Sequence, residues 1–380
     1  MAHQISRFRV ASGIRPALAC LCVLLAGLTT DLIAAPTASP PLDWRHRIPA
    51  SDFEKTAKGE WTSPLVQPAF PFEELVYSWH LHQRGDTFRL YLQVVFGSSD
   101  QTDWLYAGYW GAVTNAISNR QRPTFPRGIL DMDFLKLTTR AIGFRFKVVA
   151  AGTNELTVPP ALAVVATDNH AEASAPPAEP EQPPARVLDV PLRRQLNSEG
   201  ARMKDRCQSA ALASAMEYYG KSVPLEDIVR YSNDPEYNYP GIWPRVIGAA
   251  QEFGCDGYIE RFRDWTAVRQ TLAENKMILC SIRMKEGDCK SPPYASMGNH
   301  IVVLDGVTDD GRVVVTDSAL GKSGNGYLCQ WLQSDFETVW MRTKGGVAMV
   351  ICPPAGAKER RVTDLPPFPK NRVFPDGDDH

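Results

Sequence analysis

One cysteine stands where a thiol could act as a nucleophile. Cys207 lies between a polar run and an apolar segment in DRCQSAALASAMEYYG. The spacing of Leu212 and Met216 predicts a helix over residues 208–219, which places Cys207 at the helix start. Thiolates rather than thiols attack carbonyl carbons, and a helix N-terminus favours the anion. Cys207 is the candidate nucleophile, and a buried packing cysteine is the alternative.

The other cysteines fit different roles. Cys20 and Cys22 belong to an N-terminal apolar segment. Five more fit packing or disulfide roles: Cys255, Cys280, Cys289, Cys329 and Cys352. In an oxidising compartment several of these five could pair, and at most two bridges form if Cys207 stays a thiol. The pairing is not determined by the sequence.

A cysteine nucleophile needs a base, which is usually a histidine. His300 is the one histidine within residues 186–353, so it is the candidate base. The alternative is a histidine that only makes a structural hydrogen bond. His300 opens the strand-like run HIVVLDGV, which the turn residues TDDG connect to VVVTD. The pattern predicts a β-hairpin that ends at Asp317.

The hairpin register predicts a partner for His300. With Asp309 and Asp310 as the two loop residues, Val302 faces Asp317. His300 and Asp317 are then diagonal neighbours on one face, roughly 7–8 Å apart, within reach of a hydrogen bond. Asp317 could orient the imidazole and favour its charged form, with a solvent-facing carboxylate as the alternative. Asp305 would lie on the opposite face.

An amide side chain could help to stabilise the oxyanion that forms when a carbonyl is attacked. The backbone N–H of Cys207 is one donor, and the side chain of Gln195 in VPLRRQ is the best second candidate. The alternative for Gln195 is an exposed loop glutamine. Cys207, His300, Asp317 and Gln195 are the predicted catalytic residues, with no cofactor and no metal.

The chain divides into two regions of different pattern. Residues 61–168 alternate with period two, as in TFRLYLQVVFG, which predicts an all-β sandwich. Residues 171–185 are rich in proline and alanine and indicate an extended linker. Residues 186–353 begin with helical patterns and end with strands, an α+β layout. Residues 354–380 form a polar tail.

The net charge and the N-terminal segment indicate which partners the protein binds and where in or outside the cell it is located. A net charge of −2 without a basic run argues against nucleic acid as the main partner. Residues 1–35 combine arginines, a short apolar core and small residues, the pattern of a secretory signal peptide. The core falls short of the roughly 20 apolar residues of a membrane span. A secreted or periplasmic protein with no stable span after cleavage is expected.

The β-rich region offers little chemistry of its own. His80 and His82 would face one side of a strand, but two ligands do not make a metal site. The aromatic run WLYAGYW, residues 104–110, could be a platform for cell-wall or carbohydrate contact, although buried sandwich aromatics are more usual.

The order of these residues resembles family 39 of the cysteine peptidases, the bacteriocin-processing group, within the papain-like superfamily. The matching positions are Val190-Pro191 with Gln195, Cys207 followed by EYYG, Asn299-His300 and Asp317-Ser318. The first region is similar to the sandwich that precedes such domains in stand-alone secreted relatives. The resemblance implies a papain-like domain over 186–353. It also implies that Cys207 is nucleophile, His300 base, Asp317 its orienting partner and Gln195 the oxyanion donor.

The chain departs from the family pattern beside the nucleophile. Gln208-Ser209-Ala210 stands where the family commonly has Gly-Pro-Thr or Ser-Pro-Thr, and Asn299 and Ser318 replace a glycine and a proline. The favoured function is a secreted cysteine peptidase or amide hydrolase that forms a thioester on a peptide or amide substrate. The alternative is a catalytically inactive papain-like binding or adaptor protein. The loop over residues 284–299 is expected to line the cleft.

Overall fold

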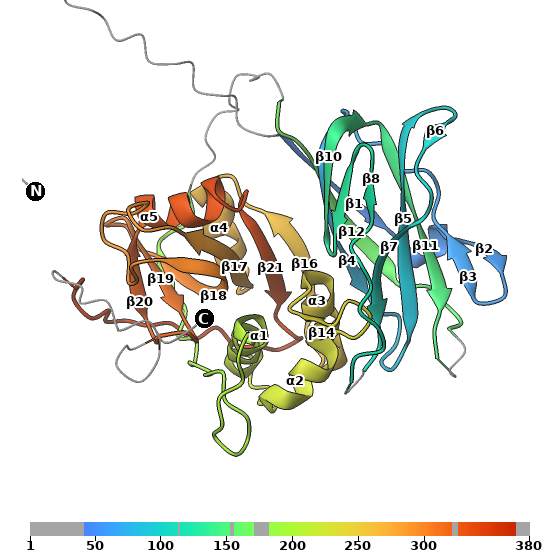
Figure 1. Ribbon diagram of the computed structural model, residues 1–380. Helices are drawn as coiled ribbons and strands as arrows, with labels where there is room; N and C mark the ends of the chain where they lie inside the picture. The colour runs from blue at the N-terminus through green and yellow to red at the C-terminus, as the bar shows by residue number, and fades with distance from the viewer. Residues whose placement is uncertain (1–41, 113–114, 153–155, 171–181, 321–325, 370–380) are drawn as a thin grey trace, which may run out of the picture. The chain divides into compact units, whose positions relative to one another are not determined.

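The structure is a computed structural model that describes residues 42–112, 115–152, 156–170, 182–320 and 326–369. The predicted signal peptide and most of the predicted linker lie outside these residues. Within the described ranges, no helix has both the length and the apolar character needed to cross a membrane. We call residues 42–170 the first half and residues 182–369 the second half. The fold is strand-rich, with several sheets (Figure 1).

The first half consists of two antiparallel sheets. In spatial order, the first contains β1 (Leu42–Ile48), β12 (Ala161–Asp168), β4 (Phe72–His80), β10 (Phe134–Ala141), β9 (Gly128–Asp131) and β8 (Thr124–Phe125). The second contains β2 (Glu54–Ala57), β3 (Glu60–Thr62), β11 (Gly143–Ala150), β5 (Phe88–Gly97) and β6 (Asp100–Gln101), and β7 (Leu105–Trp110) also pairs with β5. A single 3₁₀ turn, η1 (Ala50–Asp52), follows β1.

Alternating apolar side chains join these two sheets. Phe72 of β4 meets Phe144 of β11 edge to face, with ring centroids 5.8 Å apart. Tyr77 meets Phe146 in the same way at 5.4 Å, and all four side chains are fully buried. Period-two alternation in β5 buries Phe88, Leu90, Leu92 and Val94 in the same core. The alternation seen in the sequence therefore marks the residues that hold the two sheets together.

The second half has its helices first and most of its strands afterwards. The helices are α1 (Cys207–Tyr218), α2 (Leu225–Ser232), α3 (Trp243–Glu252), α4 (Trp265–Ala273) and α5 (Gln333–Glu337), which continues into the π-turn η2 (Thr338–Arg342). The main sheet runs β16 (Asp256–Arg261), β21 (Val347–Cys352), β17 (Met277–Met284), β18 (Met297–Val307), β19 (Arg312–Thr316) and β20 (Cys329–Leu332), and β13 (Arg186–Val187) also pairs with β18. The short strands β14 (Asn233–Asp234) and β15 (Tyr239–Pro240) pair with each other.

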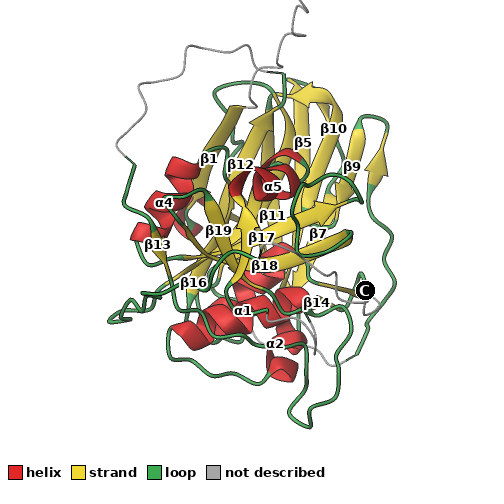
Figure 2. Cartoon of the chain, turned by 90° about the vertical axis from the view of Figure 1, so that its left-hand side faces the viewer, coloured by secondary structure: helices red, strands yellow, loops and turns green. Residues whose placement is uncertain are grey.

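The main sheet supports the start of α1. Helix α1 packs against β17 and β18 (Figure 2), and nearly every residue from Gln208 to Met216 is buried. The helix ends at Tyr218, and Gly220 follows with φ +80°, a conformation that suits glycine. Residues 360–366 also pack on this half: Val362 N–H donates to Val187 O, and Gln330 donates to Pro366 O. The sequence pattern did not indicate this packing.

Helix α3 and strand β16 join the two halves. Fully buried Arg245 donates hydrogen bonds to the carbonyls of Tyr109 and Gly111 in the first half. Strand β16 supplies Arg261, which pairs with Glu74 of β4 at 2.7 Å. The described residues of both halves belong to one compact unit, so the first half is built against the second.

A glycine in α3 allows this close packing. A Cβ atom on Gly248 would lie 2.5 Å from the Trp110 ring and 2.7 Å from Trp79 Nε1. We expect Gly248→Ala to lower the free energy of unfolding by about 1–3 kcal/mol, because the two rings are fully buried and cannot move aside. Helix propensity alone predicts the opposite, since alanine is better than glycine by about 1 kcal/mol.

Urea unfolding followed by tryptophan fluorescence measures this effect. Gly298→Ala is the control, because a Cβ there meets no atom within 4 Å and the variant should unfold like the wild type. A Gly248→Ala protein as stable as the wild type would show that the two halves are less tightly packed than described.

Candidate active site

The start of α1 fixes the position of Cys207. Cys207 is the first residue of the helix and is half-buried. The residue before it, Arg206, donates its backbone N–H to Gln195 Oε1 at 2.9 Å. The carbonyl of Arg206 accepts the N–H of Ala210, which closes the first helical turn. The Gln195 side chain therefore holds the segment that presents the thiol.

Some groups around the Cys207 sulfur lower the pKa of the thiol, and others raise it. The backbone N–H groups of Ile301 and Gln208 favour the thiolate, as expected at a helix start. Burial is the larger effect, and together with the charge of Asp317 it raises the pKa of Cys207 to about 11. The helix start favours the anion as expected, but desolvation outweighs this effect. A positive partner is required to make this thiol acidic.

His300 and Asp317 form a buried pair. His300 Nε2 lies 2.8 Å from Asp317 Oδ1, and the two residues are 4% and 0% exposed. The same carboxylate oxygen accepts the N–H of Ala319 at 2.9 Å. Burial raises the pKa of the Asp317 carboxyl, while the N–H groups of Ala319 and Leu320 act against that rise. The pair holds Nε2 of the ring against the Asp317 carboxylate.

The hairpin reaches this pairing by a route that differs from the prediction. The turn has three residues, 309–311, because Thr308 N–H bonds Arg312 O. A bulge at Asp305 then restores the expected register, so that Val303 pairs with Thr316. The longer turn and the bulge compensate for each other, so His300 pairs with Asp317 as predicted from the hairpin register. The Asp305 carboxylate accepts a hydrogen bond from Thr316 Oγ1 instead, at 2.9 Å.

Gln195 lies between the segment that carries Cys207 and the segment that carries Asp317. Its Oε1 accepts from Arg206, and its Nε2 donates to Ser318 Oγ at 3.4 Å. It is thus adjacent to the residue before Cys207 and to the residue after Asp317. The structure brings all four predicted site residues into one region, and Cys207 and His300 both line one cleft.

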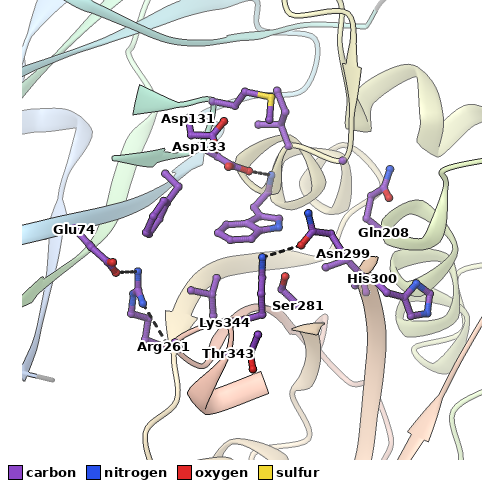
Figure 3. A pocket seen from close by; sticks show the side chains of 18 of the residues that line it. Glu74, Asp131, Asp133, Gln208, Arg261, Ser281, Asn299, His300, Thr343 and Lys344 are labelled. Atoms are coloured by element: carbon purple, nitrogen blue, oxygen red, sulfur yellow. Dashed lines mark hydrogen bonds and ion pairs between the residues drawn. The ribbon is translucent and has the colours of Figure 1, made fainter. Parts of the chain in front are cut away.

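This cleft has a volume of about 990 Å³ and walls from both halves (Figure 3). The first half contributes Glu74 and the turn at residues 131–134, and the second half contributes Trp243, Asn299 and Lys344. Of these wall residues, only Asn299 belongs to the loop that the sequence predicted to line the cleft. In the first half, the one sequence feature that marked this cleft wall is the turn in which Asp131 and Asp133 flank Met132. Met132 has φ 63° there.

Asp133 joins that turn to helix α3. Its carboxylate accepts the backbone N–H of Trp243, the first residue of α3, at 2.6 Å. Asp133 is 8% exposed, and burial raises its pKa to about 7. The first half thus supplies the cap of a second-half helix, and it holds Trp243 at the cleft.

The loop before His300 takes a different position from the predicted one. Of residues 284–299, only Asn299 lines the cleft. The carboxylate of Asp335 accepts the backbone N–H groups of Lys290 and Ser291 at 3.0 and 2.8 Å, which directs this loop toward α5. The prediction of a loop-built wall is therefore wrong for all but its last residue.

The first half shows neither a metal pair nor an aromatic platform. His80 Nδ1 lies 3.0 Å from Asp256 Oδ1, while His82 is exposed. Tyr106, Tyr109 and Trp110 are buried, as the more usual alternative predicted, whereas Trp104 is half-buried with Lys147 Nζ 4.9 Å from its ring centroid. No disulfide joins two described cysteines, and the described residues contain no cluster of metal-ligating side chains.

Comparison with known proteins identifies a family for most of the second half. Residues 187–348 match the model of the Peptidase_C39 like family, a segment that includes Gln195, Cys207, His300 and Asp317. No curated protein matches the chain. The resemblance to family 39 of the cysteine peptidases is therefore confirmed, and the chain carries a C39-like cysteine peptidase domain over residues 187–348.

Proposed function

We propose that the protein is a cysteine peptidase or amide hydrolase with a papain-like second half, in which Cys207 attacks and His300 moves the proton. The observation that carries the proposal is the buried 2.8 Å pair of His300 and Asp317, in which His300 lines the same cleft as Cys207. With Nε2 bound to Asp317, Nδ1 is the nitrogen that takes the thiol proton. The resulting imidazolium offsets the burial that disfavours the thiolate.

The reaction then proceeds by acyl transfer to sulfur. Cys207 Sγ attacks the carbonyl carbon while its proton goes to His300 Nδ1, and the oxyanion accepts hydrogen bonds from the Cys207 N–H and Gln195 Nε2. His300 returns the proton to the leaving amine, which departs and leaves a thioester. A water molecule then attacks with His300 as base, which releases the carboxylic acid and restores the thiol.

We place this activity outside the cytoplasm. The support is the signal-peptide pattern over residues 1–35. A cell-wall or carbohydrate contact through the first half has less support, because Tyr106, Tyr109 and Trp110 are buried and only Trp104 of that aromatic run is partly exposed.

One feature favours the alternative of a binding protein without turnover. Gln208 Oε1 accepts a hydrogen bond from the Cys207 thiol at 3.4 Å, a contact that favours the neutral thiol. The Gln208 side chain packs on Gly241, where an added Cβ would lie 2.6 Å from Gln208 Cδ. A glutamine held this firmly could keep the thiol protonated and narrow the approach of a substrate.

Thiol labelling tests the proposal against this alternative. Native protein is treated at pH 7 with a limiting amount of iodoacetamide, and the modified cysteines are mapped by mass spectrometry. We expect Cys207 to react at least about tenfold faster than the other described cysteines, and Cys207→Ala to lose that label. Equal labelling of all thiols, or a disulfide at Cys207 in the purified protein, would favour the binding protein.

A further inference from the structure

Two lysines line the cleft, exposed Lys136 and half-buried Lys344, and among the described residues neither forms an ion pair with a carboxylate. Lys344 follows η2, and its side chain extends into the cleft (Figure 3). Its Nζ donates a hydrogen bond to Asn299 Oδ1 at 3.2 Å. Asn299 directly precedes His300 in β18, and Lys344, Asn299 and His300 all line the cleft.

The arginines of the cleft differ from Lys344 in this respect. Each of the three forms an ion pair with a carboxylate: Arg261 with Glu74 at 2.7 Å, Arg263 with Asp43 at 2.7 Å and Arg342 with Glu337 at 2.8 Å. In the described part of the chain, no carboxylate lies within ion-pair distance of Lys344 Nζ. The cleft therefore presents this cation to whatever enters it.

The nearest acidic residues are already engaged elsewhere. Asp131 pairs with Arg122 at 2.8 Å, and Asp133 accepts the N–H of Trp243. Burial and the charge of Arg283 lower the pKa of Lys344, and the two aspartates only partly oppose this. An ammonium in partly dehydrated surroundings gains more from a carboxylate than an exposed one does, because water screens the attraction less.

We propose that Lys344 binds a carboxylate of the substrate, so that the cleft selects peptides with an acidic residue near the cleaved bond. This inference rests on the proposed peptidase function and names its substrate class. An extended peptide advances about 3.3–3.6 Å per residue, and Asn299 is the chain neighbour of His300. We place the acidic residue about one or two positions from the bond that is cut, because Lys344 and His300 line the same cleft.

Peptide binding to the Cys207→Ala protein tests this without any need for turnover. Fluorescent peptides carry either glutamate or glutamine one or two positions from the central bond, and anisotropy gives their Kd. We expect the glutamate peptide to bind about tenfold more tightly, the size of one charge-assisted hydrogen bond. Adding Lys344→Gln should abolish the preference, Lys344→Glu should reverse it and Lys344→Arg should keep it.

The control is Lys285→Gln, which removes the same charge from an exposed position outside the cleft and should keep the preference. All variants are checked by urea unfolding. Equal binding of both peptides, no saturable binding of either, or a preference that survives Lys344→Gln would overturn the inference. Selective labelling of Cys207 with equal peptide binding would reject this inference alone. A clear glutamate preference without selective labelling would reject the peptidase and keep the Lys344 site.

Discussion

Replacing Cys207 by alanine is expected to lower kcat for peptide cleavage by about 10⁴-fold or more. Without the sulfur no thioester forms, and water must attack the carbonyl directly. The imidazole and the oxyanion donors remain in place, but they contribute only the small residual acceleration left when a nucleophile is deleted. The fold should survive, because Cys207 is only half-buried at the first position of α1.

The measurement is digestion of a peptide library by wild type and variant, with products identified by mass spectrometry and kcat/KM determined for the best substrate. Cys289→Ala is the matched control, since Cys289 is also half-buried but lies outside the cleft, where its thiol contacts Asp335 O. It should keep full activity. Retention of a tenth of the wild-type rate by Cys207→Ala would show that the cysteine does not carry the reaction.

Local patterns predicted the elements that present the site. Apolar spacing placed a helix over residues 208–219, one residue later than the observed α1, because a helix start depends on a few neighbouring residues. The hairpin pattern brought His300 to Asp317, although its turn length and the Asp305 bulge were both missed. That success depended on two opposite deviations, since a one-residue shift in register would turn Asp317 to the other face of the sheet.

Strand β16 was missed for a physical reason. In DGYIER the buried positions are Gly257, Ile259 and Arg261, and only one of them carries a large apolar side chain. Arg261 is buried because it pairs with Glu74, which lies 187 residues away in sequence. A local hydrophobic pattern contains no information about an ion-pair partner so distant in sequence.

The walls and the electrostatics of the cleft were beyond the sequence for the same reason. The turn at residues 131–134 lines the cleft because Asp133 caps α3, a contact between residues 110 apart. A helix-start rule predicted a thiolate at Cys207, whereas the burial that raises its pKa comes from the packed second half. The nucleophile could be found from sequence, but its protonation depends on what is packed around it.

The second large effect is expected in His300→Asn, which should change how the alkylation rate of Cys207 depends on pH. We expect the rate of Cys207 alkylation in the wild type to be nearly constant between about pH 6 and 8, because proton transfer to His300 yields an ion pair. Without the imidazole, nothing offsets the burial that raises the pKa of the thiol to about 11, and the alkylation rate should rise about tenfold with each pH unit over the same range.

At pH 7 the variant should react about tenfold more slowly than the wild type. The thiolate fraction falls to about 10⁻⁴, but the more basic thiolate is intrinsically more nucleophilic and recovers part of that loss. Iodoacetamide rates measured by mass spectrometry across this range provide the profile. His82→Asn, the same change at an exposed histidine of the first half, is the control and should keep the flat profile.

A wild-type profile that also rises tenfold per pH unit would mean that no ion pair forms. In that case burial and the hydrogen bond to Gln208 would dominate, and the cleft would act as a binding site. A flat wild-type profile that becomes steep in His300→Asn would show the opposite: the imidazole overcomes the desolvation of the thiol. The shape of the curve separates the two functions even for a protein whose substrate is not known, because it reports on the thiol alone.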